Sequence, residues 1–186
     1  MFNRRHLVLG AAIALSPRLA QATSMSRVTA YAFTFKGLDG NEILLSSFAG
    51  HPILVVNTAS LCGYTPQYTG LQALWTQYRG KGLMVLGVPS NDFGGQEPGG
   101  RAEIVKTAQG DYHVTFPLTE KVAVKGAEAH PFYRWAAQER PLEAPRWNFH
   151  KYLIGRDGRL AGAFTSAVEP NDARLIAAIE RELAAA

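Results

Sequence analysis

The sequence predicts an α/β fold, and three consecutive stretches of the chain carry that prediction. Residues 52–56 and 83–88 are continuous apolar runs, typical of strands buried on both faces of a sheet. The residues between them predict a helix that ends near Arg79. Its apolar face consists of Leu71, Leu74, Trp75 and Tyr78. A strand, a helix and a second strand in this order form a crossover unit, which joins two parallel strands.

The ends of the predicted helix have the expected residues. Thr65 is predicted as the N-cap and Pro66 as the first helical residue, because proline is favoured where no backbone donor is needed. Gly80 and Gly82 end the helix. Cys62 therefore lies just past the end of a central strand and just before a helix.

Two β-hairpins and two helices are expected in the rest of the chain. Residues 28–35 and 42–45 predict an N-terminal hairpin, because a glycine- and asparagine-containing turn separates them. Residues 152–154 and 160–164 predict a second hairpin. Helices are expected over residues 129–138, with Pro131 in the first turn, and over residues 171–184. The core face of the last helix consists of Leu175, Ile176, Ile179 and Leu183.

Length and composition fit one globular domain, predicted over residues 27–186. The chain has 186 residues, of which 47% are hydrophobic and 18% charged, so it can bury a core. The formal net charge is +4, but Arg4, Arg5 and Arg18 precede residue 22, and without them 16 basic residues face 15 acidic ones. This balance gives no basic stripe for nucleic acid.

Residues 1–22 resemble an export signal. Arg4 and Arg5 precede the apolar run 7–15, and Ala20 and Ala22 form a small-residue cleavage pattern. Nine apolar residues are too few to span a bilayer. Adjacent arginines favour the twin-arginine route; an ordinary secretory signal or an uncleaved anchor are the alternatives. All three place the protein in the periplasm or otherwise outside the cytoplasm.

Cys62 is the one cysteine, so the chain forms no internal disulfide. A lone cysteine is often a small buried hydrophobe. At the start of a helix, however, backbone N–H groups stabilise an anion and favour a reactive thiolate. Thr65 stands where a dithiol oxidoreductase has its second cysteine, which excludes a Cys-x-x-Cys exchange mechanism.

Four motifs resemble those of the glutathione peroxidase family, in the family's order, across about residues 28–183. They are NTASLCGYTPQ at 57–67, GLMVLGVPSNDFGGQEPG at 82–99, VTFP at 114–117 and RWNF at 146–149. The resemblance implies a thioredoxin-like fold, with a central mixed β-sheet flanked by helices and an N-terminal β-hairpin. It also implies a catalytic set of Cys62, Gln96, Trp147 and Asn148.

These residue types suit peroxide reduction. A thiolate that attacks a peroxide oxygen expels an alkoxide or hydroxide, so the site needs hydrogen-bond donors. The side chains of Gln96, Trp147 and Asn148 are neutral donors, which stabilise an anion without a strong ion pair. Taken singly, each has another interpretation: Gln96 as a solvated loop residue, Trp147 as a core aromatic residue and Asn148 as a cap.

Departures from the family pattern concern the reductant and the rim of the site. Ala108 and Ser90 occupy positions where relatives have further cysteines. The oxidised Cys62 must therefore be reduced by glutathione or another external thiol, with no cofactor. Asp92 and Thr58 also depart from the pattern and could reshape the rim. The short stretch between Gln138 and Trp147 resembles monomeric members and predicts a monomer that admits organic and lipid hydroperoxides.

The predicted function is a thiol-dependent peroxidase that reduces hydrogen peroxide and organic or lipid hydroperoxides through a Cys62 sulfenic acid, in the response to oxidative stress. A non-catalytic redox sensor or thiol-binding module on the same scaffold is the alternative. No metal site is expected, since the histidines have no paired ligand spacing and are interpreted as solvated or capping. They are His6, His51, His113, His130 and His150.

Overall fold

A computed structural model describes residues 28–185, and its centre is a four-stranded sheet in the order β4-β3-β5-β6. The strands are β3 (Ile53–Thr58), β4 (Met84–Pro89), β5 (Lys151–Ile154) and β6 (Leu160–Phe164). β3 pairs with β4 in parallel and with β5 antiparallel, and β5 pairs with β6 antiparallel. The mixed sheet of the predicted thioredoxin-like fold is thus confirmed.

The crossover between β3 and β4 is made by α1 (Gln67–Tyr78), followed by a 3-10 turn (Arg79–Lys81). Gly82 ends this turn with φ of 106°, a left-handed conformation that favours glycine. A Cβ atom there would also meet the ring of His51. The crossover unit confirms the prediction that placed Cys62 between a central strand and a helix.

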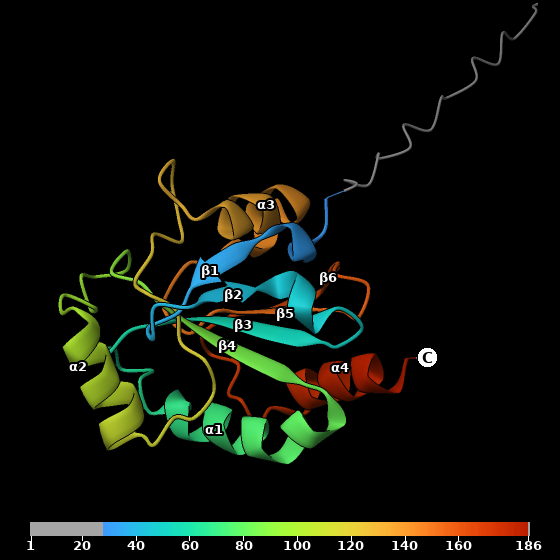
Figure 1. Cartoon of the computed structure of the whole chain (residues 1–186), viewed down its shortest axis with the longest axis horizontal. Coiled ribbons are helices and arrows are strands. Elements are labelled where there is room, and N and C mark those ends of the chain that lie inside the picture. The colour runs from blue at the N-terminus through green and yellow to red at the C-terminus, as the bar shows by residue number, and fades with distance from the viewer. Residues whose placement is uncertain (1–27, 186) are drawn as a thin grey trace, which may run out of the picture.

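Both faces of the sheet are covered (Figure 1). α1 and α4 (Ala173–Ala184) lie on one face, and α3 (Pro131–Glu139) lies with the hairpin of β1 (Thr34–Lys36) and β2 (Glu42–Leu44) on the other. Successive residues of a strand point to opposite faces. Accordingly, Leu54 and Val56 of β3 join the core under α1 and α4, while Ile53 and Val55 join the core under α3.

A distorted helix precedes the VTFP motif. α2 (Arg101–Val105) is a regular helix, and Lys106–Asp111 continues it as a π-helical segment. Ala108 lies in this segment and is completely buried in the core that contains Cys62.

Several predicted boundaries were wrong, each because of a specific hydrogen bond. Residues 28–33 are not part of a strand: Ala30–Ala32 form a 3-10 turn, and the Ala30 N–H donates to the Gly158 carbonyl at 2.8 Å. α3 begins at Pro131 because the His130 Nδ1 accepts from the Phe132 N–H. α4 begins at Ala173 because the Asp172 carboxylate caps it.

The start of α1 also differs from the prediction. The helix begins at Gln67, and Thr65 does not cap it. The Thr65 hydroxyl instead accepts from the Cys62 N–H at 3.0 Å and donates to the Ala59 carbonyl at 2.9 Å. The residue expected to start the helix therefore closes the turn that holds the cysteine.

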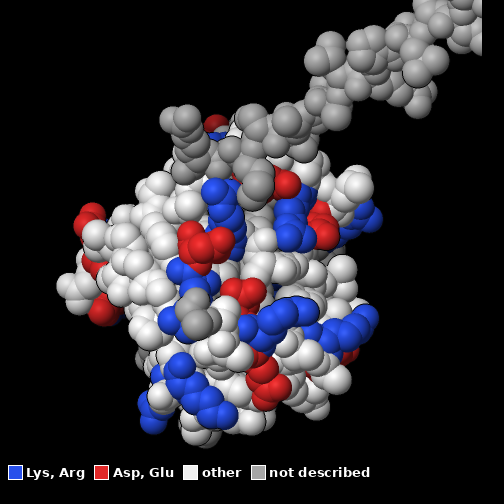
Figure 2. All heavy atoms as spheres, turned by 90° about the vertical axis from the view of Figure 1, so that its right-hand side faces the viewer, with Lys and Arg blue, Asp and Glu red and all other residues white. Residues whose placement is uncertain are grey.

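Surface charges of both signs are interspersed on the face drawn in Figure 2, without a continuous basic area. Between residues 28 and 185, no helix is long and apolar enough to cross a membrane. The predicted export signal at residues 1–22, the predicted domain start at residue 27 and His6 lie outside the described residues.

Candidate active site

Cys62 lies in the turn between β3 and α1, and its side chain is 7% exposed. The backbone N–H of Tyr64 donates to the Cys62 Sγ at 3.4 Å. Among residues 28–185, this is the one hydrogen bond made to the sulfur. The turn is closed by the Thr65 N–H, which donates to the Cys62 carbonyl at 2.9 Å. A negative charge on the sulfur would thus face a fixed backbone donor.

The loop that carries Gln96 is tied directly to the cysteine turn. The Leu61 N–H donates to the Gln96 carbonyl at 3.0 Å. The Ser60 hydroxyl donates to the Glu97 carboxylate at 3.1 Å. Burial raises the pKa of Glu97, and the hydrogen bond from Ser60 opposes that rise. Hydrogen bonds from Ser60 and Leu61 to Glu97 and Gln96 therefore fix the position of the Gln96 loop relative to Cys62.

The same loop has two further restraints. Lys121 Nζ donates to the carbonyls of Glu97 at 3.0 Å and Gly99 at 2.8 Å. Gly94 and Gly95 both have positive φ, 66° and 63°, which explains the glycine pair. A Cβ atom on Gly94 would also lie 3.4 Å from the Trp147 ring. The glycines therefore let the loop pass close to the indole.

Asn148 is completely buried and links its segment to the Gln96 loop. Its side-chain amide donates to the Gln96 Oε1 at 2.9 Å and to the Phe93 carbonyl at 3.4 Å. The Asn57 side-chain amide, at the end of β3, donates to the Trp147 carbonyl at 3.1 Å. Trp147 itself is 39% exposed, and its ring centroid lies 6.0 Å from that of Phe93.

The structure therefore gathers the segments of all four predicted residues at the ends of β3 and β4. Gln96 and Asn148 contact each other through side chains, and Cys62 is joined to Gln96 through the backbone of Leu61. Within residues 28–185, no side chain of the other three donates to the sulfur. Their catalytic roles stay a prediction. Of the single-residue alternatives, a core position does not fit Trp147, which is 39% exposed, and a helix cap does not fit Asn148, whereas Gln96 is half-buried in a loop.

Residues that depart from the family pattern have defined structural positions. The Asp92 carboxylate accepts from the backbone N–H groups of Val124 at 2.6 Å and Lys125 at 3.1 Å. Ser90, like Ala108, is completely buried. Asp92 thus anchors the chain at 124–125.

Lys151 was not predicted as part of the site, and its side chain is completely buried in β5. Its Nζ donates to the Gln67 Oε1 at 2.7 Å and to the Phe149 carbonyl at 2.8 Å. The Gln67 amide in turn donates to the Ser166 carbonyl at 2.7 Å and to the Glu169 carboxylate at 3.1 Å. Burial lowers the pKa of Lys151 to about 8, against the opposing effect of Glu169. This network joins the first residue of α1 to β5.

His150 was predicted to be solvated or capping, which was wrong. The side chain is buried, and burial lowers the pKa of His150 to about 4, with the charge of Lys151 acting in the same direction. The prediction is confirmed for His51 and His113, which are exposed, and for His130, which caps α3. The available signal was a polar pair, His150 and Lys151, immediately before the apolar residues of β5. Over residues 28–185, no group of three potential ligands could hold a metal.

Comparison with known proteins identifies one family and its fold. The family model described as glutathione peroxidase matches residues 30–137. The chain is 42% identical over 159 residues to hydroperoxy fatty acid reductase gpx1 of Synechocystis sp., covering 81% of this chain and 94% of that protein. It is 39% identical over 145 residues to a glutathione peroxidase of Lactococcus lactis, covering 76% and 92%. The crystal structure of T. cruzi GPX1 superimposes with a TM-score of 0.67 at 30% identity, covering 84% and 97%.

Proposed function

The chain belongs to the glutathione peroxidase family and is a thiol-dependent peroxidase, and we propose that Cys62 is the residue that attacks the peroxide. One observation carries this proposal: the chain's single cysteine lies in a restrained turn with the Tyr64 N–H directed at its sulfur. An anion-stabilising donor at a cysteine is what a peroxide-reducing thiolate needs.

The first step forms one bond and breaks one. The Cys62 thiolate attacks the terminal oxygen of ROOH, an S–O bond forms, and the O–O bond breaks. The alkoxide leaves with a proton from solvent as the alcohol ROH, while Cys62 becomes a sulfenic acid. The sulfur is oxidised by two electrons, and the peroxide is reduced by two.

Gln96, Trp147 and Asn148 are proposed to assist that step with neutral donors. Because the Gln96 Oε1 accepts from Asn148, the amide N–H groups of Gln96 are the end left to donate to the peroxide. The exposed indole of Trp147 lies beside the same loop. A donor that stabilises the departing oxygen lowers the barrier because the charge develops in the transition state.

The reductant is proposed to be glutathione or another external thiol, with no cofactor. The chain has no second cysteine, so the sulfenic acid condenses with one thiol and releases water. A second thiol attacks the mixed disulfide, regenerates Cys62 and leaves as the oxidised disulfide. Two thiols thus supply the two electrons that each peroxide consumes.

We propose that the protein is exported through the twin-arginine-like signal at residues 1–22 and therefore acts in the periplasm. It is proposed to be a monomer and to take part in the response to oxidative stress. The short connection before Trp147 leaves room for bulky substrates, so organic and lipid hydroperoxides join hydrogen peroxide as proposed substrates. The relative named hydroperoxy fatty acid reductase supports that range.

The test is steady-state consumption of hydrogen peroxide by the purified protein with glutathione as the reductant. Cys62→Ser is the blank, because serine keeps the size of the side chain and removes the thiolate. Turnover that disappears in the variant supports the proposal. Equal consumption by both proteins would contradict it. A single oxidation of Cys62 that stalls with every thiol offered would favour the redox sensor instead.

A further inference from the structure

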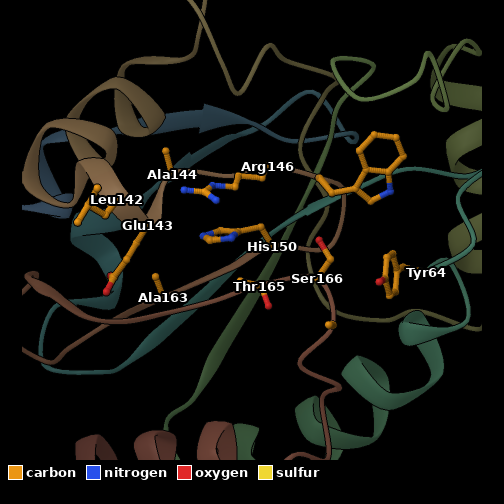
Figure 3. Close-up of a pocket in the computed structure, with 11 residues that line it drawn as sticks. Tyr64, Leu142, Glu143, Ala144, Arg146, His150, Ala163, Thr165 and Ser166 are labelled. Atoms are coloured by element: carbon orange, nitrogen blue, oxygen red, sulfur yellow. The ribbon is translucent and has the colours of Figure 1, made fainter.

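A cavity of about 420 Å³ opens beside Trp147 and extends away from the cysteine turn. In Figure 3, Tyr64 lies at one end and Leu142 and Glu143 at the other, with His150 and Arg146 between them. Tyr64 also donates the hydrogen bond to the Cys62 sulfur. The donor is the Tyr64 backbone N–H, so this end of the cavity lies beside the cysteine turn, although Cys62 itself is not among the residues that line the cavity. Its volume is within the range of small-molecule sites.

Most of the cavity wall is apolar. Side chains from two segments of the sequence contribute to it: Leu142, Ala144, Trp147, Ala163 and Ala167. Leu142 is 86% exposed and Trp147 is 39% exposed. Large apolar side chains held open to solvent around a concave surface favour a ligand with apolar surface of its own.

His150 supplies an unsatisfied polar group in this cavity. The residue is 4% exposed and lines the cavity, and its Nε2 is buried with no hydrogen-bond partner among the described residues. Leaving a buried polar atom unpaired is costly, so a ligand atom that pairs with it gains affinity. Because burial lowers the pKa of His150 to about 4, the ring is neutral at neutral pH and carries one N–H.

Arg146 supplies the charge. Its side chain is exposed, lines the same cavity and forms no ion pair within residues 28–185. The acidic residue of the cavity, Glu143, is already paired with Arg140 at 2.9 Å. In Figure 3 the side chains of Arg146 and His150 point toward the same part of the cavity. A free guanidinium and an imidazole N–H together suit a carboxylate.

We propose that this cavity binds the carboxylate of a fatty-acid hydroperoxide between Arg146 and His150, with the hydrocarbon chain passing Trp147 and Tyr64 toward Cys62. The inference rests on the proposed function, since it assumes that Cys62 reduces the hydroperoxide. Glutathione shares the carboxylate chemistry. The apolar wall favours the hydrocarbon chain, because glutathione has little apolar surface to bury.

The test compares two substrates that differ only in the carboxylate: the hydroperoxide of an unsaturated fatty acid and its methyl ester, both below micelle-forming concentrations. In the double-displacement cycle, kcat/KM for the hydroperoxide reports the oxidation step and kcat/KM for glutathione reports the reduction step. The variants are Arg146→Gln and, as a matched control, Arg181→Gln, an exposed arginine of α4 that does not line the cavity.

The proposal expects the wild type to prefer the acid over the ester by about tenfold in kcat/KM, as a charge-assisted hydrogen bond would give. Arg146→Gln should bring this ratio close to one, and Arg181→Gln should leave it as in the wild type. Equal use of acid and ester by the wild type would overturn the proposal. So would an effect of Arg146→Gln confined to kcat/KM for glutathione, since the cavity would then serve the thiol.

A binding measurement tests this site independently of peroxide reduction by Cys62. The corresponding hydroxy fatty acid, which Cys62 cannot reduce, is titrated calorimetrically into the wild type, Arg146→Gln and His150→Phe. Weaker binding by about tenfold in both variants supports the site, and unchanged binding overturns it. If hydrogen peroxide is not turned over but the hydroxy acid binds, the proposed function fails and the site stands. If hydrogen peroxide is turned over and the hydroxy acid does not bind, the site alone fails.

Discussion

The side-chain amide of Asn148 donates a hydrogen bond of 2.9 Å to the Gln96 Oε1. Asn148 is completely buried, and this bond fixes which end of the Gln96 amide faces Asn148. The donor end of Gln96 is consequently available to a peroxide. Asn148 thus acts on the site chiefly through Gln96.

Asn148→Asp tests this relationship with almost no change in size. A carboxylate accepts where the amide donated, so the Gln96 amide should turn over and present its oxygen to the peroxide. We expect the second-order rate of Cys62 oxidation by hydrogen peroxide, measured by stopped flow, to fall about 100-fold. Asn171→Asp, at an exposed asparagine, is the control.

A double-mutant cycle gives the same relationship a second check. If Asn148 acts through Gln96, then Asn148→Ala added to Gln96→Ala should slow the oxidation of Cys62 little further. Fully multiplicative effects would mean that the two residues contribute separately.

The sequence predicted the sheet, the crossover unit and the position of Cys62 because buried strands and amphipathic helices leave periodic apolar patterns. It did not predict the buried partners of Lys151 or the unpaired Nε2 of His150. Those depend on which segments pack around β5, and apolar periodicity alone does not contain that information. Thr65 shows the same limit: a threonine before a proline is typical of a helix cap, yet its hydroxyl is used by Cys62 and Ala59.

Thr65→Val should disturb the cysteine turn. Valine keeps the shape but removes the acceptor of the Cys62 N–H and the donor to Ala59, which leaves both groups unpaired in a buried setting. The free energy of unfolding should fall by about 1–3 kcal/mol, measured by urea denaturation. The oxidation of Cys62 should also slow. Thr65→Ser keeps the hydroxyl, so its free energy of unfolding and its rate of Cys62 oxidation should both be close to those of the wild type. If Thr65→Ser is as impaired as Thr65→Val, the effect comes from packing and not from the hydrogen bonds.

His150 should make the protein sensitive to acid. Its pKa is about 4 in the folded chain and near 6.5 when unfolded, so the unfolded chain binds more protons between those values. Stability should therefore fall as the pH drops from 6.5 to 4, by about 3 kcal/mol in total. His150→Gln should flatten this part of the stability profile, whereas His51→Gln, at an exposed histidine, should not. Parallel profiles for all three proteins would contradict the assignment.

Lys151 should make the stability of the protein depend on pH in the alkaline range. Its pKa of about 8 lies below the unfolded value of 10.5, so the unfolded chain again binds more protons within that interval. The contribution of Lys151 to stability should rise as the pH increases from 8 to 10. Lys151→Met should remove that rise, as measured by urea denaturation against the wild type at each pH. Lys81→Met, at an exposed lysine, is the control, and a rise that persists in Lys151→Met would show that another group causes it.

The central claim is that Cys62 itself reduces the peroxide, and the most direct test is to give the reduced protein one equivalent of hydrogen peroxide without any thiol. The oxidised protein is then trapped with dimedone, and the modified residue is located by peptide mass spectrometry. We expect the adduct on Cys62, formed fully within the time that consumes the peroxide and slowed in Gln96→Ala. Two results would contradict the central claim. Either the peroxide is consumed while Cys62 stays unmodified, or Cys62 stays reduced and the peroxide is not consumed.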